Sequence, residues 1–242
     1  MSRDEVADVA ASVGLGALAG FCVLALCVFG DGAPLFTDGG LHAWSVAHRP
    51  DVAVALARGL TATGTGAVPY ALAVLAGIVA VRTPRHRLPA AGLAVLCLAS
   101  GQAVRYGVMT LAARARPPRA DWATHASGWA FPSGHTTTAT LAAGLLISAI
   151  CLREPRGRTL FATAAGCWGA LVGLTRVYLG VHWFTDVAGG WLLGIGWLGL
   201  WVCLMAWWLP DRFLTGPANT PIDPTEDHAH QDPGRGGRSH PA

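Results

Sequence analysis

The sequence predicts an all-α protein, a bundle of six transmembrane helices with a short interfacial helix between the first and second spans. The first reason is composition: 52% of the 242 residues are hydrophobic and 13% are charged, about half the charged share of a soluble domain. The second is that six apolar runs come near the ~20 residues with which a helix crosses a bilayer. The third is that only short polar stretches separate these runs, as in a single domain.

The first span, 9–29, lacks a basic segment before it and a small-residue cleavage site after it. We therefore expect a retained anchor rather than a signal peptide. Residues 35–60 mix polar and apolar side chains, which predicts an interfacial helix and a loop on the membrane surface. Glycine and alanine recur inside the spans and favour close helix packing. The remaining spans are expected at 64–81, 89–110, 134–152, 160–179 and 184–209.

Charge in the connecting turns predicts the orientation of the bundle. The turns 82–87 and 153–158 hold three Arg each, and basic turns stay on the cytoplasmic side of a membrane. Both termini are then expected in the cytoplasm, and the other face of the bundle outside the cell membrane. Residues 1–209 would form the membrane domain. Residues 210–242, rich in Pro, Gly, Asp and His, would form a disordered cytoplasmic tail.

The basic residues do not indicate nucleic-acid binding, because a net charge of +3 is too small and too dispersed. All 17 basic residues are Arg and none is Lys, a bias typical of a GC-rich bacterial genome. No cluster of carboxylates is present to hold a metal ion. We therefore expect neither a metal nor another cofactor.

The most informative string of residues holds Arg176, His182 and Asp186. His182 and Asp186 are four apart and would share one helix face at the start of span six. The carboxylate can accept one ring N–H of His182, fix its tautomer and leave the other nitrogen free to attack. A turn at Gly180 would bring Arg176 back to the same place. An interfacial His–Asp pair with a snorkelling Arg would give the same pattern.

A second string, Pro132-Ser133-Gly134-His135, stands at the start of span four. A helix N-terminus binds anions, so Ser133 and Gly134 could hold phosphate oxygens while His135 protonates a leaving oxygen. An ordinary helix start with Ser133 as N-cap would look alike. The third string, Arg116-Pro117, is a common loop dipeptide and is weak evidence for a phosphate site by itself.

In order and spacing the three strings resemble the type 2 phosphatidic acid phosphatase superfamily, which also holds bacterial acid phosphatases and vanadium haloperoxidases. The pattern of that family reads Lys-x6-Arg-Pro, then Pro-Ser-Gly-His, then Ser-Arg-x5-His-x3-Asp. Here the second string is complete, the third has Thr175 in place of Ser, and the first has Met109 in place of Lys. The resemblance covers about residues 100–190.

The resemblance implies a metal-independent membrane phosphatase that acts on lipid phosphates or diphosphates at the outer membrane boundary. His182 would attack phosphorus and form a phosphohistidine, Asp186 would steady the imidazolium, and His135 would donate the proton. The phosphate would be bound by Arg116, Ser133, Gly134 and Arg176. The implied substrates are a polyprenyl (di)phosphate such as that of undecaprenol, phosphatidic acid, or phosphatidylglycerol phosphate.

Met109 leaves the expected site one cation short, a loss of about 2–4 kcal/mol of transition-state stabilisation if it resembles the loss of an oxyanion donor. Arg105 lies one helical turn earlier on the same face, about 6 Å deeper, and is the nearest replacement. Arg114 and Arg119 are the other candidates. Two alternatives stay open: a lipid phosphotransferase, and a weakly active protein that binds a lipid phosphate.

Overall fold

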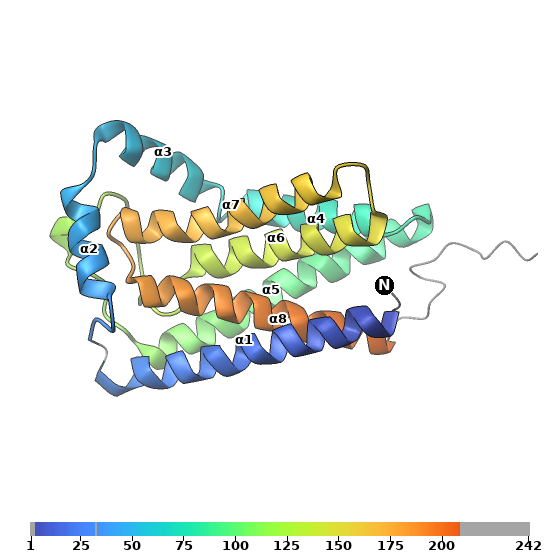
Figure 1. Ribbon diagram of the computed structural model, residues 1–242, viewed down its shortest axis with the longest axis horizontal. Coiled ribbons are helices and arrows are strands. Elements are labelled where there is room, and N and C mark those ends of the chain that lie inside the picture. Colours follow the sequence, from blue (N-terminus) through green and yellow to red (C-terminus); the bar gives the residue numbers. More distant parts are fainter. Residues whose placement is uncertain (1–2, 32, 209–242) are drawn as a thin grey trace, which may run out of the picture.

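The computed structural model describes residues 3–31 and 33–208, and within these residues the fold is helical without a strand (Figure 1). This confirms the all-α class. The expected tail, 210–242, lies outside the described residues. The α-helices are α1 (Arg3–Asp31), α2 (Asp38–Ala47), α3 (Asp51–Ala62), α4 (Ala67–Ala80), α5 (Arg87–Ala112), α6 (Gly134–Arg153), α7 (Arg158–Tyr178) and α8 (Phe184–Trp208), and the 3₁₀ turns are η1 (Pro84–His86) and η2 (Arg119–Asp121).

Five helices (α1, α5, α6, α7 and α8) are long and apolar enough to cross a membrane, and their bounds agree with the expected spans to within a few residues. The second span differs from the prediction. The helix α4 has 14 residues, about 21 Å by helical rise, which is short for a ~30 Å hydrocarbon core. Together with α3 it forms a pair bent by 51°, and this pair is the sixth candidate span.

The segment before α4 was expected to form one interfacial helix and a loop, but it forms the two helices α2 and α3. Glycine and proline residues explain this difference. Pro50, in an extended conformation, caps the start of α3, so residues 35–60 hold two helices. Gly66 has a φ of +70°, which breaks the helical path between α3 and α4. A Cβ atom at Gly64 would come 2.3 Å from Cγ1 of Val172. The break therefore lies tightly against α7.

The helix α1 packs along α8 through small residues (Figure 1). A Cβ atom at Gly199 would lie 2.6 Å from Cα of Gly14, and one at Gly196 would lie 2.6 Å from Cγ of Leu18. The two helices can approach this closely only because these side chains are absent. The expected packing role of small residues is thus seen in detail at this contact.

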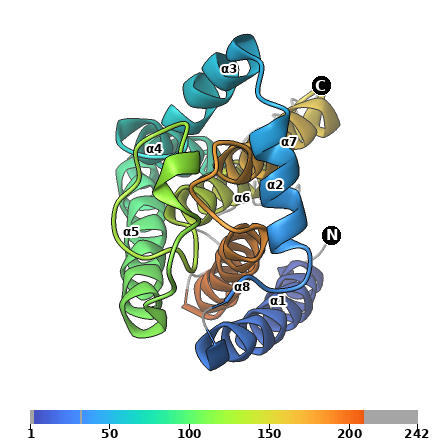
Figure 2. The same ribbon diagram turned by 90° about the vertical axis from the view of Figure 1, so that its left-hand side faces the viewer.

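The connections gather at two ends of the bundle (Figure 1). The arginine-rich turns, η1 with its neighbours and 153–158, lie at the same end as the start of α1. The helices α2 and α3 lie at the other end, with the loop 113–133 and the turn 179–183. Figure 2 views this second end, where α2 passes beside α7 and α8. All three motif strings reach this end.

The surface helices hold the loops of this end in place. Arg49 donates to the carbonyl oxygen of Asp121 at 2.6 Å, and the ring of His42 lies 3.0 Å from the carboxylate of Asp121. Arg58 donates to the carbonyl of Ala123 at 2.6 Å. Gly180 has a φ of +72°, and a Cβ atom there would lie 2.6 Å from the Asp121 oxygen. The expected turn at Gly180 therefore depends on glycine for both its conformation and its space.

Candidate active site

A cavity of about 440 Å³ opens at this end of the bundle, within the usual size range of small-ligand sites. Three Arg and three His line it, and no Asp or Glu is among the described residues that do. Such a lining suits an anion. The lining residues are Thr65, Gln102, Arg105, Tyr106, Met109, Arg116, His125, Ala126, Ser127, Gly128, Gly134, His135, Thr138, Arg176 and His182.

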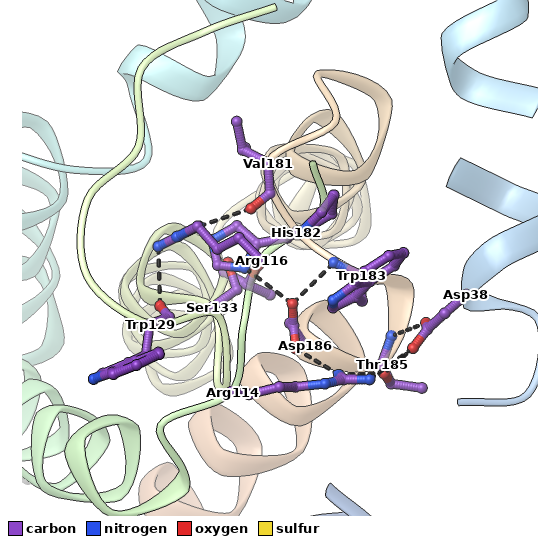
Figure 3. Close-up of polar contacts among 12 residues, drawn as sticks. Asp38, Arg114, Arg116, Trp129, Ser133, Val181, His182, Trp183, Thr185 and Asp186 are labelled. Carbon is purple, nitrogen blue, oxygen red and sulfur yellow. Dashed lines mark hydrogen bonds and ion pairs between the residues drawn. The ribbon is translucent and has the colours of Figure 1, made fainter. Parts of the chain in front are cut away.

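His182 lies in the turn just before α8, and its two ring nitrogens have different partners (Figure 3). Nδ1 is 3.3 Å from Oδ2 of Asp186, and Nε2 is 2.8 Å from a terminal nitrogen of Arg116. A guanidinium only donates hydrogen bonds, so Nε2 must accept, and Nδ1 must carry the hydrogen that it donates to Asp186. The geometry thus selects the tautomer with its free lone pair on Nε2.

The surroundings of His182 keep its ring neutral. The side chain is buried, and burial lowers the pKa of His182 well below its ordinary value, with Arg116 and Arg176 lowering it further. The ring is therefore unprotonated on Nε2 at neutral pH, which is the form that can act as a nucleophile.

Arg116 is held by the loop that follows α5. One terminal nitrogen donates to Nε2 of His182, while the remaining bonds go to backbone carbonyls at 2.7–3.0 Å. Burial lowers the pKa of Arg116 to about 10, opposed by the charge of Asp186 and reinforced by that of Arg105. The guanidinium stays charged at neutral pH. The carbonyl groups are those of Ser127, Gly128, Trp129 and Val181.

Two further guanidinium groups have N–H groups to offer to a ligand. Arg176, in the last turn of α7, donates to Oγ1 of Thr61 at 3.1 Å, and its Nε has no partner among the described residues. Arg105, on α5, has a terminal nitrogen 3.1 Å from the sulfur of Met109, and its buried Nε also has no partner. A Cβ atom at Gly134 would lie 3.3 Å from the guanidinium carbon of Arg105. Arg105 therefore reaches the start of α6 despite its deeper position on α5.

The start of α6 meets the cavity through Gly134 and His135, but not through Ser133. Ser133 is fully buried, and its hydroxyl accepts a hydrogen bond from the hydroxyl of Thr136 at 3.0 Å. Ser133, which we expected to hold phosphate, therefore does not line the cavity itself. His135 points its Nε2 toward Oγ1 of Thr65, 3.5 Å away.

Neither of the other candidates for the missing cation lines the cavity. Arg114 is fully buried behind Asp186, to which it donates at 2.6 Å. It also pairs with Asp38 at 2.9 Å. Arg119 is exposed and lies over the ring of Trp122. Arg105 remains as the candidate that the structure brings to the site.

Several residues at the site carry no motif signal in the sequence. Gln102 and Thr138 share a hydrogen bond at the deep end of the cavity. Thr65 and His125 line it from loops. A polar Gln102 one helical turn before Arg105 could have been noticed as a polar side chain on one face of an apolar span. Asp38 gave no such signal. In the part of the chain that the structure describes, no three His, Cys, Asp or Glu side chains gather to hold a metal ion.

Comparison with known proteins gives consistent findings. A model of the PAP2 superfamily matches residues 90–210, half of the chain. Phosphatidylglycerophosphatase B of Bacillus subtilis (strain 168) is 38% identical over 85 residues, which are 34% of this chain and 41% of that protein. The protein of the same name from Escherichia coli (strain K12) is 33% identical over 114 residues, 47% and 41% of the two chains. Lipid A 1-phosphatase of Rhizobium etli is 41% identical over 76 residues, 31% and 29% of the chains.

These matches span less than half the length of the relatives. A solved structure covers more: the first transmembrane PAP2 type phosphatidylglycerolphosphate phosphatase from Bacillus subtilis superposes with a TM-score of 0.65, over 80% of this chain and 94% of that one, at 24% identity. Together with the apolar helices, this likeness shows the fold of a multi-pass membrane protein.

Proposed function

The chain belongs to the PAP2 superfamily, and on this ground we propose that it is a membrane phosphatase that removes phosphate from a lipid at the cationic cavity. The observation that carries the proposal is the set of contacts around His182. Its unprotonated Nε2 faces Arg116 in a cavity that Arg105 and Arg176 also line, and its Nδ1 faces Asp186.

In the first step, Nε2 of His182 attacks phosphorus, and the bond between phosphorus and the lipid oxygen breaks. The leaving oxygen takes a proton from His135 on the other wall of the cavity, and His135 enters this step as an imidazolium beside the bound phosphate anion. The phosphorylated ring keeps its Nδ1–H on Asp186, so its new positive charge faces a carboxylate. In the second step, water gives a proton to His135 and attacks phosphorus, the P–N bond breaks, and inorganic phosphate leaves.

The three arginines stabilise the charge on the phosphoryl oxygens as the transfer proceeds. Arg116 exchanges its bond with Nε2 for a bond with a phosphate oxygen. Arg176 and Arg105 bring Nε–H groups that have no partner in the described part of the chain. In this proposal Arg105 takes over the charge that the motif Lys supplies elsewhere in the superfamily, and Ser133 supports the first turn of α6 without touching the substrate. No metal is required.

A lipid phosphate is the substrate class that fits the position of the cavity, at one end of a membrane bundle. The relatives named phosphatidylglycerophosphatase B and lipid A 1-phosphatase support a phosphate group on a lipid. The arginine-rich turns lie at the other end (Figure 1), which supports a cavity on the extracytoplasmic face of the cell membrane and cytoplasmic termini. The candidates are phosphatidylglycerol phosphate, phosphatidic acid, a polyprenyl (di)phosphate and lipid A 1-phosphate.

The test is phosphate release by the purified full-length protein across these lipids, in liposomes and with EDTA present. We expect at least one lipid to be hydrolysed, EDTA to have no effect, and His182→Ala to be inactive. His48→Ala, which removes an exposed histidine of the same end outside the cavity, is the matched control and should keep full activity.

Two results would contradict this proposal. Phosphate that appears on an added alcohol in place of water would identify a phosphotransferase. Tight binding of a lipid phosphate without release or transfer would identify a binding protein.

A further inference from the structure

A chain of three buried charges lies behind His182 (Figure 3). Arg114 donates to Oδ1 of Asp186 at 2.6 Å and to Oδ2 of Asp38 at 2.9 Å, and all three side chains have no exposed area. With both carboxylates ionised, this cluster carries one net negative charge. The cluster ends at Oδ2 of Asp186, which faces His182.

Asp38 joins the surface helix α2 to the first turn of α8. Its Oδ1 accepts the backbone N–H of Thr185 at 2.9 Å, and its Oδ2 accepts the Thr185 hydroxyl at 2.6 Å. Oδ2 also accepts the N–H of Leu35 at 3.0 Å. Asp38 is thus a fully bonded, buried carboxylate contributed by an element far from the three motif strings in sequence.

We propose that Asp38 and Arg114 are positioning residues for phosphoryl transfer at His182, an inference that rests on the proposed function. They hold Asp186 in one orientation. They also give the cluster the single negative charge that balances the imidazolium formed when His182 bonds to phosphorus.

The orientation of the Asp186 carboxylate follows from its contact with the planar guanidinium of Arg114, which binds Asp38 and Asp186 at once. Because Arg114 holds Oδ1 of Asp186, Oδ2 is left for Nδ1 of His182 and for the N–H of Trp183, 2.9 Å away. Without Arg114, Asp186 would be a buried carboxylate with no strong positive partner, a costly state.

The need for a net negative charge in the cluster follows from the other groups around His182. Among the residues that the structure describes, Asp186 is the negative group that faces the ring, and the other titratable or charged groups facing it are basic. If Arg114 paired with Asp186 alone, the pair would be neutral. The second carboxylate, that of Asp38, gives the cluster its net negative charge. The basic groups are Arg105 on α5, Arg116 in the following loop, His135 on α6 and Arg176 on α7.

The contrast between orthovanadate and inorganic phosphate tests this role. Vanadate can accept a bond from Nε2 and so mimics the transferring phosphoryl group, whereas phosphate only contacts the arginines. The variant Asp38→Asn keeps the shape of the side chain and removes its charge. We expect it to weaken vanadate binding at least about tenfold and to leave phosphate binding within about twofold, as for other groups that orient a reacting side chain.

The same variant should lower kcat for a lipid phosphate at least about tenfold with KM nearly unchanged. Asp121→Asn is the matched control, because Asp121 also ties α2 to a loop of this end, through His42 at 3.0 Å. It should leave both affinities and kcat unchanged. If the Asn variant does not fold, Asp38→Glu, which keeps the charge, tests the role of Asp38 instead. We expect this variant to bind vanadate much more tightly than phosphate.

An equal loss of vanadate and phosphate affinity in Asp38→Asn would overturn the proposal, as would an equal effect of Asp121→Asn. A folded Asp38→Glu variant that loses its preference for vanadate would do the same. Neither ligand needs turnover. A wild-type protein that releases no phosphate from any lipid would therefore contradict the proposed function, while the affinity ratio would still test the positioning role.

Discussion

Arg105 and Met109 are the residues at which this chain departs from the pattern of its superfamily. Met109 lines the cavity with an uncharged side chain, and its sulfur lies 3.1 Å from the guanidinium of Arg105. The longer Arg side chain makes up for its deeper start on α5 and lies against Gly134. In the proposed function Arg105 supplies the missing cation from one helical turn earlier on the same face, and its guanidinium lies at the start of α6.

This arrangement predicts a compensating pair of mutations. Arg105→Ala should lower kcat/KM by about 10²-fold, the usual cost of losing a group that stabilises transition-state charge. Adding Met109→Lys to that variant should restore part of the loss, because the new ammonium would enter the same cavity. Steady-state kinetics on a lipid phosphate measures both effects.

Met109→Leu is the control for this pair, since it keeps the apolar volume and removes only the sulfur. It should have nearly wild-type kinetics. Unchanged kcat/KM in a folded Arg105→Ala protein would mean that Arg116 and Arg176 suffice, and the compensation would be refuted.

The turns between helices determine on which side of the membrane the cavity lies. The exposed turn η2 belongs to the end with the cavity, and the turn 154–157 belongs to the arginine-rich end (Figure 1). Positive turns are retained in the cytoplasm. The cavity end should therefore face outward.

Cysteine labelling in intact cells checks this orientation. In a background in which the six native cysteines are replaced, Ala120→Cys should react with a membrane-impermeant maleimide, because residue 120 is exposed in η2. Pro155→Cys, exposed in the opposite turn, should react only after the cells are permeabilised. The background protein without added cysteine is the control, and the reverse pattern of labelling would place the site in the cytoplasm.

For the molecule as a whole, hydropathy and motif spacing predict a large part of the architecture. Apolar length locates α1 and α5 to α8, because a bilayer span needs a long run of apolar residues. It does not locate the break at Gly66, where a bent pair replaces one straight helix. The order of apolar runs and turns in the sequence does not reveal this bend. The bend lies where Gly64 packs against Val172 of α7, a residue far away in the sequence.

The same limit holds for the site. Local spacing brings His182 and Asp186 together, because four positions separate them, although His182 lies in the turn before α8 and not on the helix face where we expected it. The partnership of Asp38 with Arg114 joins residues far apart in the chain, and no local pattern encodes it. Arg114, a candidate for the missing cation, is buried against Asp186, while Arg116, two residues later, lines the cavity. Ser133 likewise does not line the cavity, and its hydroxyl accepts a hydrogen bond from Thr136 in the first turn of α6.

A covalent phosphohistidine at His182 is the central claim. Purified protein mixed with a lipid carrying labelled phosphate, and quenched within milliseconds in alkaline denaturant, should carry acid-labile label that mass spectrometry places on His182. His48→Ala should keep the label and His182→Ala should have none. Rapid phosphate release by the wild type with no label on His182 at any quench time, or full activity in His182→Ala, would contradict the account.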